Sequence, residues 1–217
     1  MNPNKKKVSL NPMKKAILIF TLAMILTKTS YSQRFLGGIQ GGINLAQVVG
    51  DGWSGYNKLG FNGGVFVHYM NPSEVSAVGF DLMYMGKGSR NVLTPTSTDP
   101  VMIYRYHYVE VPVYYMHYFD NITVRGGLNW SYAFSSELDD GGAPKEITGL
   151  KNHNFLIHGG AGYFVSERME LSANLQLSVN SIIDLDRSQL NLPGASLRRN
   201  GVYHNLIQVS LKYYLSI

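Results

Sequence analysis

Few side chains in this 217-residue sequence are suited to chemistry, because cysteine is absent. Disulfides, zinc-thiolate sites and thiol catalysis are therefore excluded. Histidine is the next candidate for a metal ligand or general base, but no His-Glu-x-x-His motif or similar ligand spacing occurs. The sequence predicts no metal site and no cofactor, and we interpret the histidines as ordinary polar side chains: His68, His107, His117, His153, His158 and His204.

A Ser-His-carboxylate set acting on lipids could be drawn from Ser131, His153 and Glu137. No motif marks these residues as a site, since Gly-x-Ser-x-Gly is absent and a chain rich in Ser supplies such a trio by chance. The acidic run at residues 137–140 (ELDD) misses the spacing of a calcium loop. It predicts an exposed loop tip, as do Asp184 and Asp186. We therefore predict that the protein is not an enzyme.

The amino terminus predicts a cleaved secretory signal over residues 1–32. Lysines at positions 5–7 and 14–15 precede an apolar run at 16–26 (AILIFTLAMIL), and small residues follow, so cleavage is expected after Ser32. A membrane anchor is the alternative, but a spanning helix needs about 20 apolar residues and this run is shorter. Met13 is an alternative start, because MKK directly precedes the apolar run.

The charge balance changes once this segment is removed. The whole chain has a formal net charge of +5, but its first 32 residues hold six of the 19 basic residues and none of the 14 acidic ones. The mature chain, residues 33–217, therefore has no basic excess for binding nucleic acid. The hydrophobic content of 45% also excludes an intrinsically disordered chain.

The mature chain alternates apolar and polar residues with a period of two, as β-strands do. Residues 171–180 (LSANLQLSVN) show this most clearly, and no segment has a 3.6-residue period. We predict eight strands, near residues 35–47, 59–70, 75–87, 104–118, 122–134, 154–165, 169–181 and 203–216.

The connections between these strands alternate in length. Three are tight turns, at residues 71–74, 119–121 and 166–168, and the other four, near 48–58, 88–103, 135–153 and 182–202, are long. Short turns at one end, long loops at the other and long strands are typical of an outer-membrane barrel. The predicted fold is all-β, an eight-stranded antiparallel up-and-down transmembrane β-barrel formed by residues 33–217.

Alternation alone does not say which face is outside, because a soluble barrel such as a lipocalin has its apolar face inward. The apolar face here is too bulky for the narrow interior of eight strands, and the other face carries Gly and small polar residues. We therefore assign Val124, Leu175, Leu177 and Leu211 to the lipid side and Gln176 to the lumen. Aromatic residues of the lipid side gather at both strand ends and predict an interfacial girdle: Tyr69, Tyr84, Tyr115, Trp130, Tyr132, Tyr163 and Tyr213.

Charged residues on the lumenal side predict a structural polar network: Asp81, Glu110, Arg125 and Lys212. Glu110 and Arg125 lie on neighbouring strands, so we expect them to form an ion pair, because an unpaired charge in a narrow barrel is costly. Lys87 and Glu170 share this side and could extend the network.

Several segments resemble the PorT-like outer-membrane barrel family of Bacteroidota. They are residues 108–113 (YVEVPV), 124–127 (VRGG), 158–163 (HGGAGY) and 37–44 (GGIQGGIN), and their order spans nearly the whole mature chain. The carboxyl terminus departs from a common barrel ending, since Ile217 replaces a final aromatic residue. The resemblance implies an eight-stranded barrel in the outer membrane, and the namesake of the family is an accessory of type IX protein secretion.

These observations predict a non-enzymatic barrel in the outer membrane of a Gram-negative bacterium, with both termini periplasmic. Its expected role is that of an accessory or structural component of an envelope assembly such as protein secretion. Expected partners are outer-membrane lipid and other envelope or secretion proteins, and no nucleic acid. A stand-alone structural or small-solute barrel is the alternative, and a lipid-modifying enzyme is less favoured.

Overall fold

The computed structural model describes residues 35–49, 55–91, 101–147, 149–184 and 201–215. The predicted signal sequence, residues 1–32, lies outside the described residues. The described residues contain no helix that is long and apolar enough to cross a membrane.

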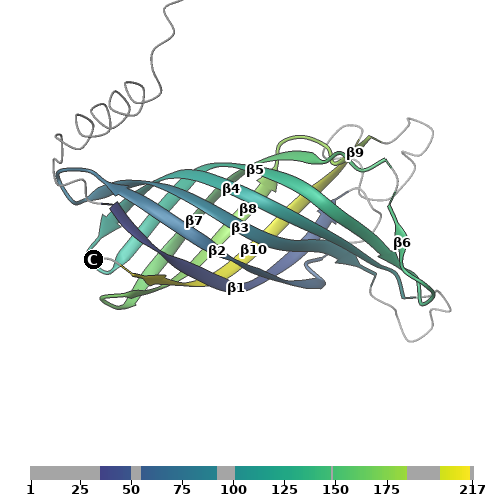
Figure 1. Ribbon diagram of the computed structural model, residues 1–217, viewed down its shortest axis with the longest axis horizontal. Helices are drawn as coiled ribbons and strands as arrows, with labels where there is room; N and C mark the ends of the chain where they lie inside the picture. The colour runs from purple at the N-terminus through teal and green to yellow at the C-terminus, as the bar shows by residue number, and fades with distance from the viewer. Residues whose placement is uncertain (1–34, 50–54, 92–100, 148, 185–200, 216–217) are drawn as a thin grey trace, which may run out of the picture. The chain divides into compact units, whose positions relative to one another are not determined.

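Eight long antiparallel strands dominate the described part of the chain (Figure 1). Each pairs with its sequence neighbours, and the first also pairs with the last, which closes the barrel. The fold class predicted from the alternation is thereby confirmed. The strands are β1 (Phe35–Val49), β2 (Lys58–Met70), β3 (Ser76–Arg90), β4 (Ile103–Phe119), β5 (Ile122–Asp139), β7 (His153–Ser166), β8 (Met169–Ser178) and β10 (Gly201–Tyr214). Two short strands, β6 (Lys145–Glu146) and β9 (Ile183–Asp184), pair with β5 and β10.

The strands are strongly staggered around the barrel. Following the paired residues once around the wall from Phe35 leads back to β1 at Leu45, ten residues further along. A stagger of this size tilts eight strands by about 40° from the barrel axis and leaves an interior that side chains just fill. The width of the lumen is thus fixed by the backbone before any side chain is considered.

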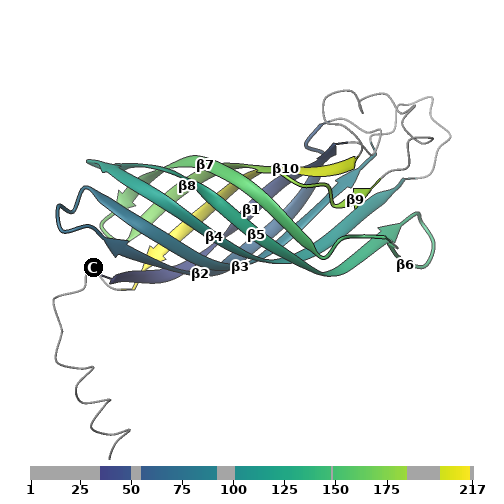
Figure 2. The same cartoon turned by 90° about the horizontal axis from the view of Figure 1, so that it is seen from above.

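The strands extend further at the long-loop end than the alternation predicted. β3 continues to Arg90 and β5 to Asp139, and the β5–β6 hairpin projects from that end of the barrel (Figure 2). β8 ends earlier than predicted, at Ser178. The side chain of Asn180 accepts a hydrogen bond from the Phe155 amide at 2.6 Å, which ends the β7–β8 ladder. Pro112 interrupts the ladder between β3 and β4, where no pair lies between Phe80–Val113 and Met83–Glu110.

The two faces of the wall differ sharply in chemistry. Large apolar side chains cover the outside, and Phe61 and Leu128 are each 67% exposed. Gln176, Arg125 and Lys212 are buried inside, whereas Val124, Leu175 and Leu211 are exposed on the outside, as the alternation indicated. All seven residues of the predicted girdle lie on this outer face as well: Tyr69, Tyr84, Tyr115, Trp130, Tyr132, Tyr163 and Tyr213.

A charge on the outer face tests this assignment. Leu175 lies on β8 midway between the aromatic residues of the two ends, and Leu175→Lys should destabilise the barrel in lipid by about 2–4 kcal/mol. Leu175→Met, which keeps the volume and polarity, should change the free energy of unfolding by much less. Urea unfolding in phospholipid vesicles measures both. Equal stability of the two variants would show that Leu175 does not face lipid.

Candidate functional site

Six charged side chains are buried in the lumen and form three ion pairs. Lys87 pairs with Glu110, Arg125 with Glu170, and Lys212 with Asp81 at 3.4 Å. All six side chains are at most 5% exposed. Three cations and three anions leave the group with no net charge, which is the condition under which such charges can be buried.

Each buried carboxylate accepts hydrogen bonds from one cation and from two uncharged donors. Glu110 accepts from Lys87, from Ser131 at 2.7 Å and from Asn129 at 2.7 Å. Because three donors replace the water that each carboxylate loses, the cost of burying it is largely offset. The other two sets are Gln40, Tyr114 and Lys212 around Asp81, and Thr123, Arg125 and Tyr214 around Glu170.

Each buried cation also lies over the face of an aromatic ring. The Lys87 ammonium is 4.6 Å from the centroid of the Tyr108 ring. Lys212 lies 4.7 Å from the Phe66 ring, and the Arg125 guanidinium lies 5.8 Å from the Tyr114 ring. Attraction between a cation and the ring quadrupole is strongest where the cation is buried, and Lys87, Arg125 and Lys212 are all buried.

The predicted pair between Glu110 and Arg125 is wrong. The register of β4 and β5 sets Glu110 opposite Ser131, whereas Arg125 lies opposite Met116, near the short-turn end. Arg125 therefore reaches Glu170 on β8, and Glu110 reaches Lys87 on β3. Adjacent strands were predicted correctly, but their register, which decides the partners, was not available from the alternation.

The lumen is closed at both ends by apolar and aromatic side chains. At the long-loop end a cluster that includes Met85, Tyr108, Ile182 and Leu206 is fully buried. A smaller cluster around Met116 lies toward the short-turn end. Among the described residues, side chains thus fill most of the lumen, and the expectation that its lining would be small and polar holds only for part of the wall.

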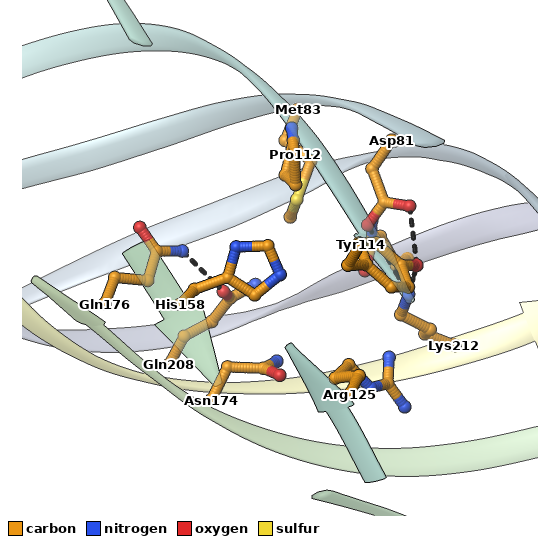
Figure 3. A pocket seen from close by; sticks show the side chains of 11 residues that line it. Asp81, Met83, Pro112, Tyr114, Arg125, His158, Asn174, Gln176, Gln208 and Lys212 are labelled. Atoms are coloured by element: carbon orange, nitrogen blue, oxygen red, sulfur yellow. Dashed lines mark hydrogen bonds and ion pairs between the residues drawn. The ribbon is translucent and has the colours of Figure 1, made fainter. Parts of the chain in front are cut away.

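One small cavity remains between the polar groups of the lumen. It measures about 20 Å³, room for a water molecule. Figure 3 shows Asp81, Tyr114 and Lys212 converging on one side of it, and Gln176 and Gln208 on the other. Nothing larger than water fits this cavity, so it is not a solute-binding site.

Glycine makes room for the ion pairs at defined points of the wall. A methyl group on Gly162 would overlap Glu170, Thr123 and Arg125. Gly159, on the same strand, faces outward, and a methyl group there would meet only a backbone oxygen at 3.8 Å. The two glycines therefore have different roles, and only Gly162 is required by close packing.

The six histidines divide equally between the two faces. His68, His158 and His204 lie in the lumen, and His68 contacts the Tyr114 hydroxyl at 2.8 Å. The other three lie on the outside, each beside an aromatic ring: His107 with Tyr84, His117 with Phe119, and His153 with Trp130. The described residues contain no cluster of three His, Asp or Glu side chains that could hold a metal ion.

The residues considered for lipid hydrolysis are not brought together. Ser131 points into the lumen and donates to Glu110, whereas His153 lies on the outside and accepts from Trp130. Glu137 lies beyond both, where β5 pairs with β6. A nucleophile and base on opposite faces of a sheet cannot act on one substrate, so this set forms no catalytic site.

The acidic run at the tip of the β5–β6 hairpin is paired with local cations. Asp139 accepts from the Gly141 amide and from Arg105 at 3.0 Å, and these bonds lower the pKa of its carboxyl. Asp140 accepts from Lys145 at 2.5 Å, which lowers its pKa in the same way. Residues 137–139 belong to β5, and the side chains of Asp139 and Asp140 are 29% and 26% exposed. The run is therefore a partly buried strand end and turn, not the exposed loop tip that the sequence predicted. Asp184 falls at the edge of the described residues and Asp186 outside them.

Comparisons with known proteins identify the fold and no family. No family model matches the chain, and no curated protein matches it. Neisserial surface protein A (NspA) is a solved structure with 13% identity and a TM-score of 0.53, over 82% of this chain and 96% of that one. The Yersinia pestis attachment invasion locus protein Ail, solved with the heparin analogue sucrose octasulfate, has 11% identity and a TM-score of 0.49, over 83% and 99%. The likeness to NspA, at 13% identity, supports the barrel fold alone and says nothing about activity.

The assignment of ion pairs can be tested by double-mutant cycles. Arg125→Leu should destabilise the barrel by about 3–5 kcal/mol, because it leaves Glu170 buried without a cation. Adding Glu170→Gln should recover part of this loss, whereas adding Glu110→Gln should not. Urea unfolding of the single and double variants gives the coupling energies. Coupling of Arg125 to Glu110 instead of Glu170 would contradict the pairing.

The role of glycine can be tested on β7 with a matched pair of variants. Gly162→Ala should destabilise the barrel by about 1–3 kcal/mol, because the added methyl group displaces the Arg125–Glu170 pair. Gly159→Ala should cost at most about 0.5 kcal/mol, since its methyl group enters open space on the outer face. Thermal unfolding in detergent measures both. A similar loss in the two variants would mean that close packing at Gly162 is unimportant.

Proposed function

We propose that this protein is a non-enzymatic outer-membrane barrel that acts through its outer surfaces, as an accessory or structural component of an envelope assembly such as protein secretion. The observation that supports this proposal best is the combination of an apolar outside with a filled lumen. The outside suits lipid, and the inside leaves no route for solutes.

The height of the apolar band supports the membrane location. On β7, the outward residues His153 and Tyr163 mark the two aromatic levels and lie ten residues apart. At about 3.3 Å per residue and a tilt of about 40°, their levels are about 25 Å apart, which is the height of the lipid-facing band in outer-membrane barrels. The barrel therefore fits an outer membrane, where closed barrels avoid unpaired strand edges in lipid.

The interior argues against the two competing functions. A small-solute barrel needs a continuous passage, but the described lumen holds a cavity of about 20 Å³ between two side-chain clusters. A lipid-modifying enzyme needs a nucleophile and base within reach of each other, and Ser131 and His153 lie on opposite faces. A stand-alone structural barrel is the remaining alternative.

The choice of an assembly role over a stand-alone role rests on the resemblance to the PorT-like barrels. The strand segment that resembles that family contains both Glu110 and Pro112. Glu110 supplies the carboxylate of one buried ion pair, and Pro112 interrupts the β3–β4 ladder. By the usual orientation of such barrels, the tight turns and both strand termini would lie in the periplasm and the β5–β6 hairpin would lie outside the cell.

The proposal is tested by extraction with a mild detergent through an affinity tag on the native chain. We expect other envelope proteins to co-purify in fixed stoichiometry, and a deletion strain to secrete fewer proteins. Purified barrel in a planar bilayer should show no steady conductance, because the lumen is filled.

An unrelated tagged eight-stranded barrel from the same strain is the control for non-specific capture. A lone monomer with unchanged secretion in the deletion strain would overturn the accessory role in favour of a stand-alone barrel. Steady conductance would instead favour a solute pathway, and altered membrane lipid in the deletion strain would favour an enzyme.

A further inference from the structure

An apolar cleft lies on the outer face of β4, β5 and β7. Its volume is about 400 Å³, within the range of about 300–1,000 Å³ that is typical of small-ligand pockets. Its walls are almost wholly apolar. The side chains that form it are Val111, Val113, Leu128, Trp130, Phe155 and Val179.

The local path of the chain explains why the wall is open here. β8 stops at Ser178, and the Val179 amide makes a last bond to the Phe155 carbonyl at 2.7 Å. Ile182 then turns into the mouth of the barrel, where it is fully buried. Phe155 is consequently the last residue of β7 with a backbone-to-backbone hydrogen bond to this segment, which Val179 donates, and Phe155 and Trp130, paired across β7 and β5, form adjacent walls of the cleft.

The cleft runs from the interfacial level into the apolar band. Trp130 belongs to the aromatic belt at the long-loop end, and Leu128 precedes it by two residues on the same strand. At the tilt of this barrel, Leu128 lies about 5 Å deeper. An occupant that enters between them must therefore be apolar at its inner end and in contact with the polar interface at its outer end.

A hydrogen-bond donor lies beside the cleft, on His153, which precedes the lining residue Phe155 by two residues on β7. The Trp130 indole N–H donates to Nδ1 of His153 at 3.2 Å, and the two rings are stacked at 5.8 Å. Because Nδ1 accepts this bond, the proton of the neutral imidazole lies on Nε2. That N–H makes no hydrogen bond to another described residue. Tyr132 packs against the same ring at 5.3 Å and fixes its orientation.

We propose that this cleft binds one membrane phospholipid, with an acyl chain between Leu128 and Phe155 and a phosphate or ester oxygen accepting a hydrogen bond from Nε2 of His153. The apolar walls, the depth and the single donor beside the cleft match the two ends of such a lipid. The inference rests on the membrane location proposed above.

Native mass spectrometry of the detergent-purified barrel incubated with phosphatidylglycerol tests the site. The wild type should retain one lipid, and His153→Phe should reduce the retained fraction by about fivefold, the effect of one hydrogen bond. His117→Phe is the matched control, because His117 also lies outside beside a ring, at the other end of the barrel. Equal retention in both variants, or a lipid-free dimer, would overturn the proposal.

Fluorescence quenching gives an independent test in vesicles. The chain has two tryptophans, so Trp53→Phe leaves Trp130 as the sole reporter. Phosphatidylcholine brominated along its acyl chain should quench Trp130 more strongly than a tryptophan placed by Tyr84→Trp in a Trp53→Phe, Trp130→Phe background. Tyr84 belongs to the same aromatic belt and is similarly exposed, at 41% against 37% for Trp130, but it lies outside the cleft. Failure of the barrel to insert would overturn the membrane location together with the site. Insertion with equal quenching at both positions would overturn the lipid site alone.

Discussion

The closed backbone of eight strands with a ten-residue stagger fixes a lumen that side chains must fill. Six of those side chains are charged, and their burial is tolerable only because each has an opposite charge beside it in the lumen. Much else follows from this requirement. Uncharged donors supply the remaining hydrogen bonds of each carboxylate, and an aromatic ring lies beside each cation. Gly162 leaves the space that the Arg125–Glu170 pair occupies.

The alternation of the sequence predicted the fold and the face of each strand because both are local properties. Shifting a strand by one residue would turn every side chain to the wrong face, so the pattern fixes the faces strongly. The partners across the lumen depend instead on the stagger, which is set by all eight strands together. Glu110 and Arg125 are near each other in the sequence and on adjacent strands, yet the register separates them by several residues.

The role of the aromatic residues that face the lumen was beyond the sequence. Tyr114 and Tyr115 are neighbours in the chain, but one bonds to Asp81 inside the barrel and the other is 56% exposed in the outer belt. Their parity predicted the outward position of Tyr115. It did not reveal that buried cations would lie over the inward-facing rings of Tyr108 and Phe66. An aromatic residue on the polar side of a strand looks like an exception to the alternation, so its role could not be predicted from the pattern.

A filled and charge-balanced lumen confines any specific recognition to the outside of the barrel, and that outside is not uniform. On β3, β4, β5 and β7 the belt at the long-loop end holds two groups of contacting rings, one with Tyr84 and one with Trp130 and His153. On β1 and β10, Gln47 lies opposite Asn205 near the same end of the wall. The side of the barrel that carries the contacting rings is therefore the side on which we propose the lipid site.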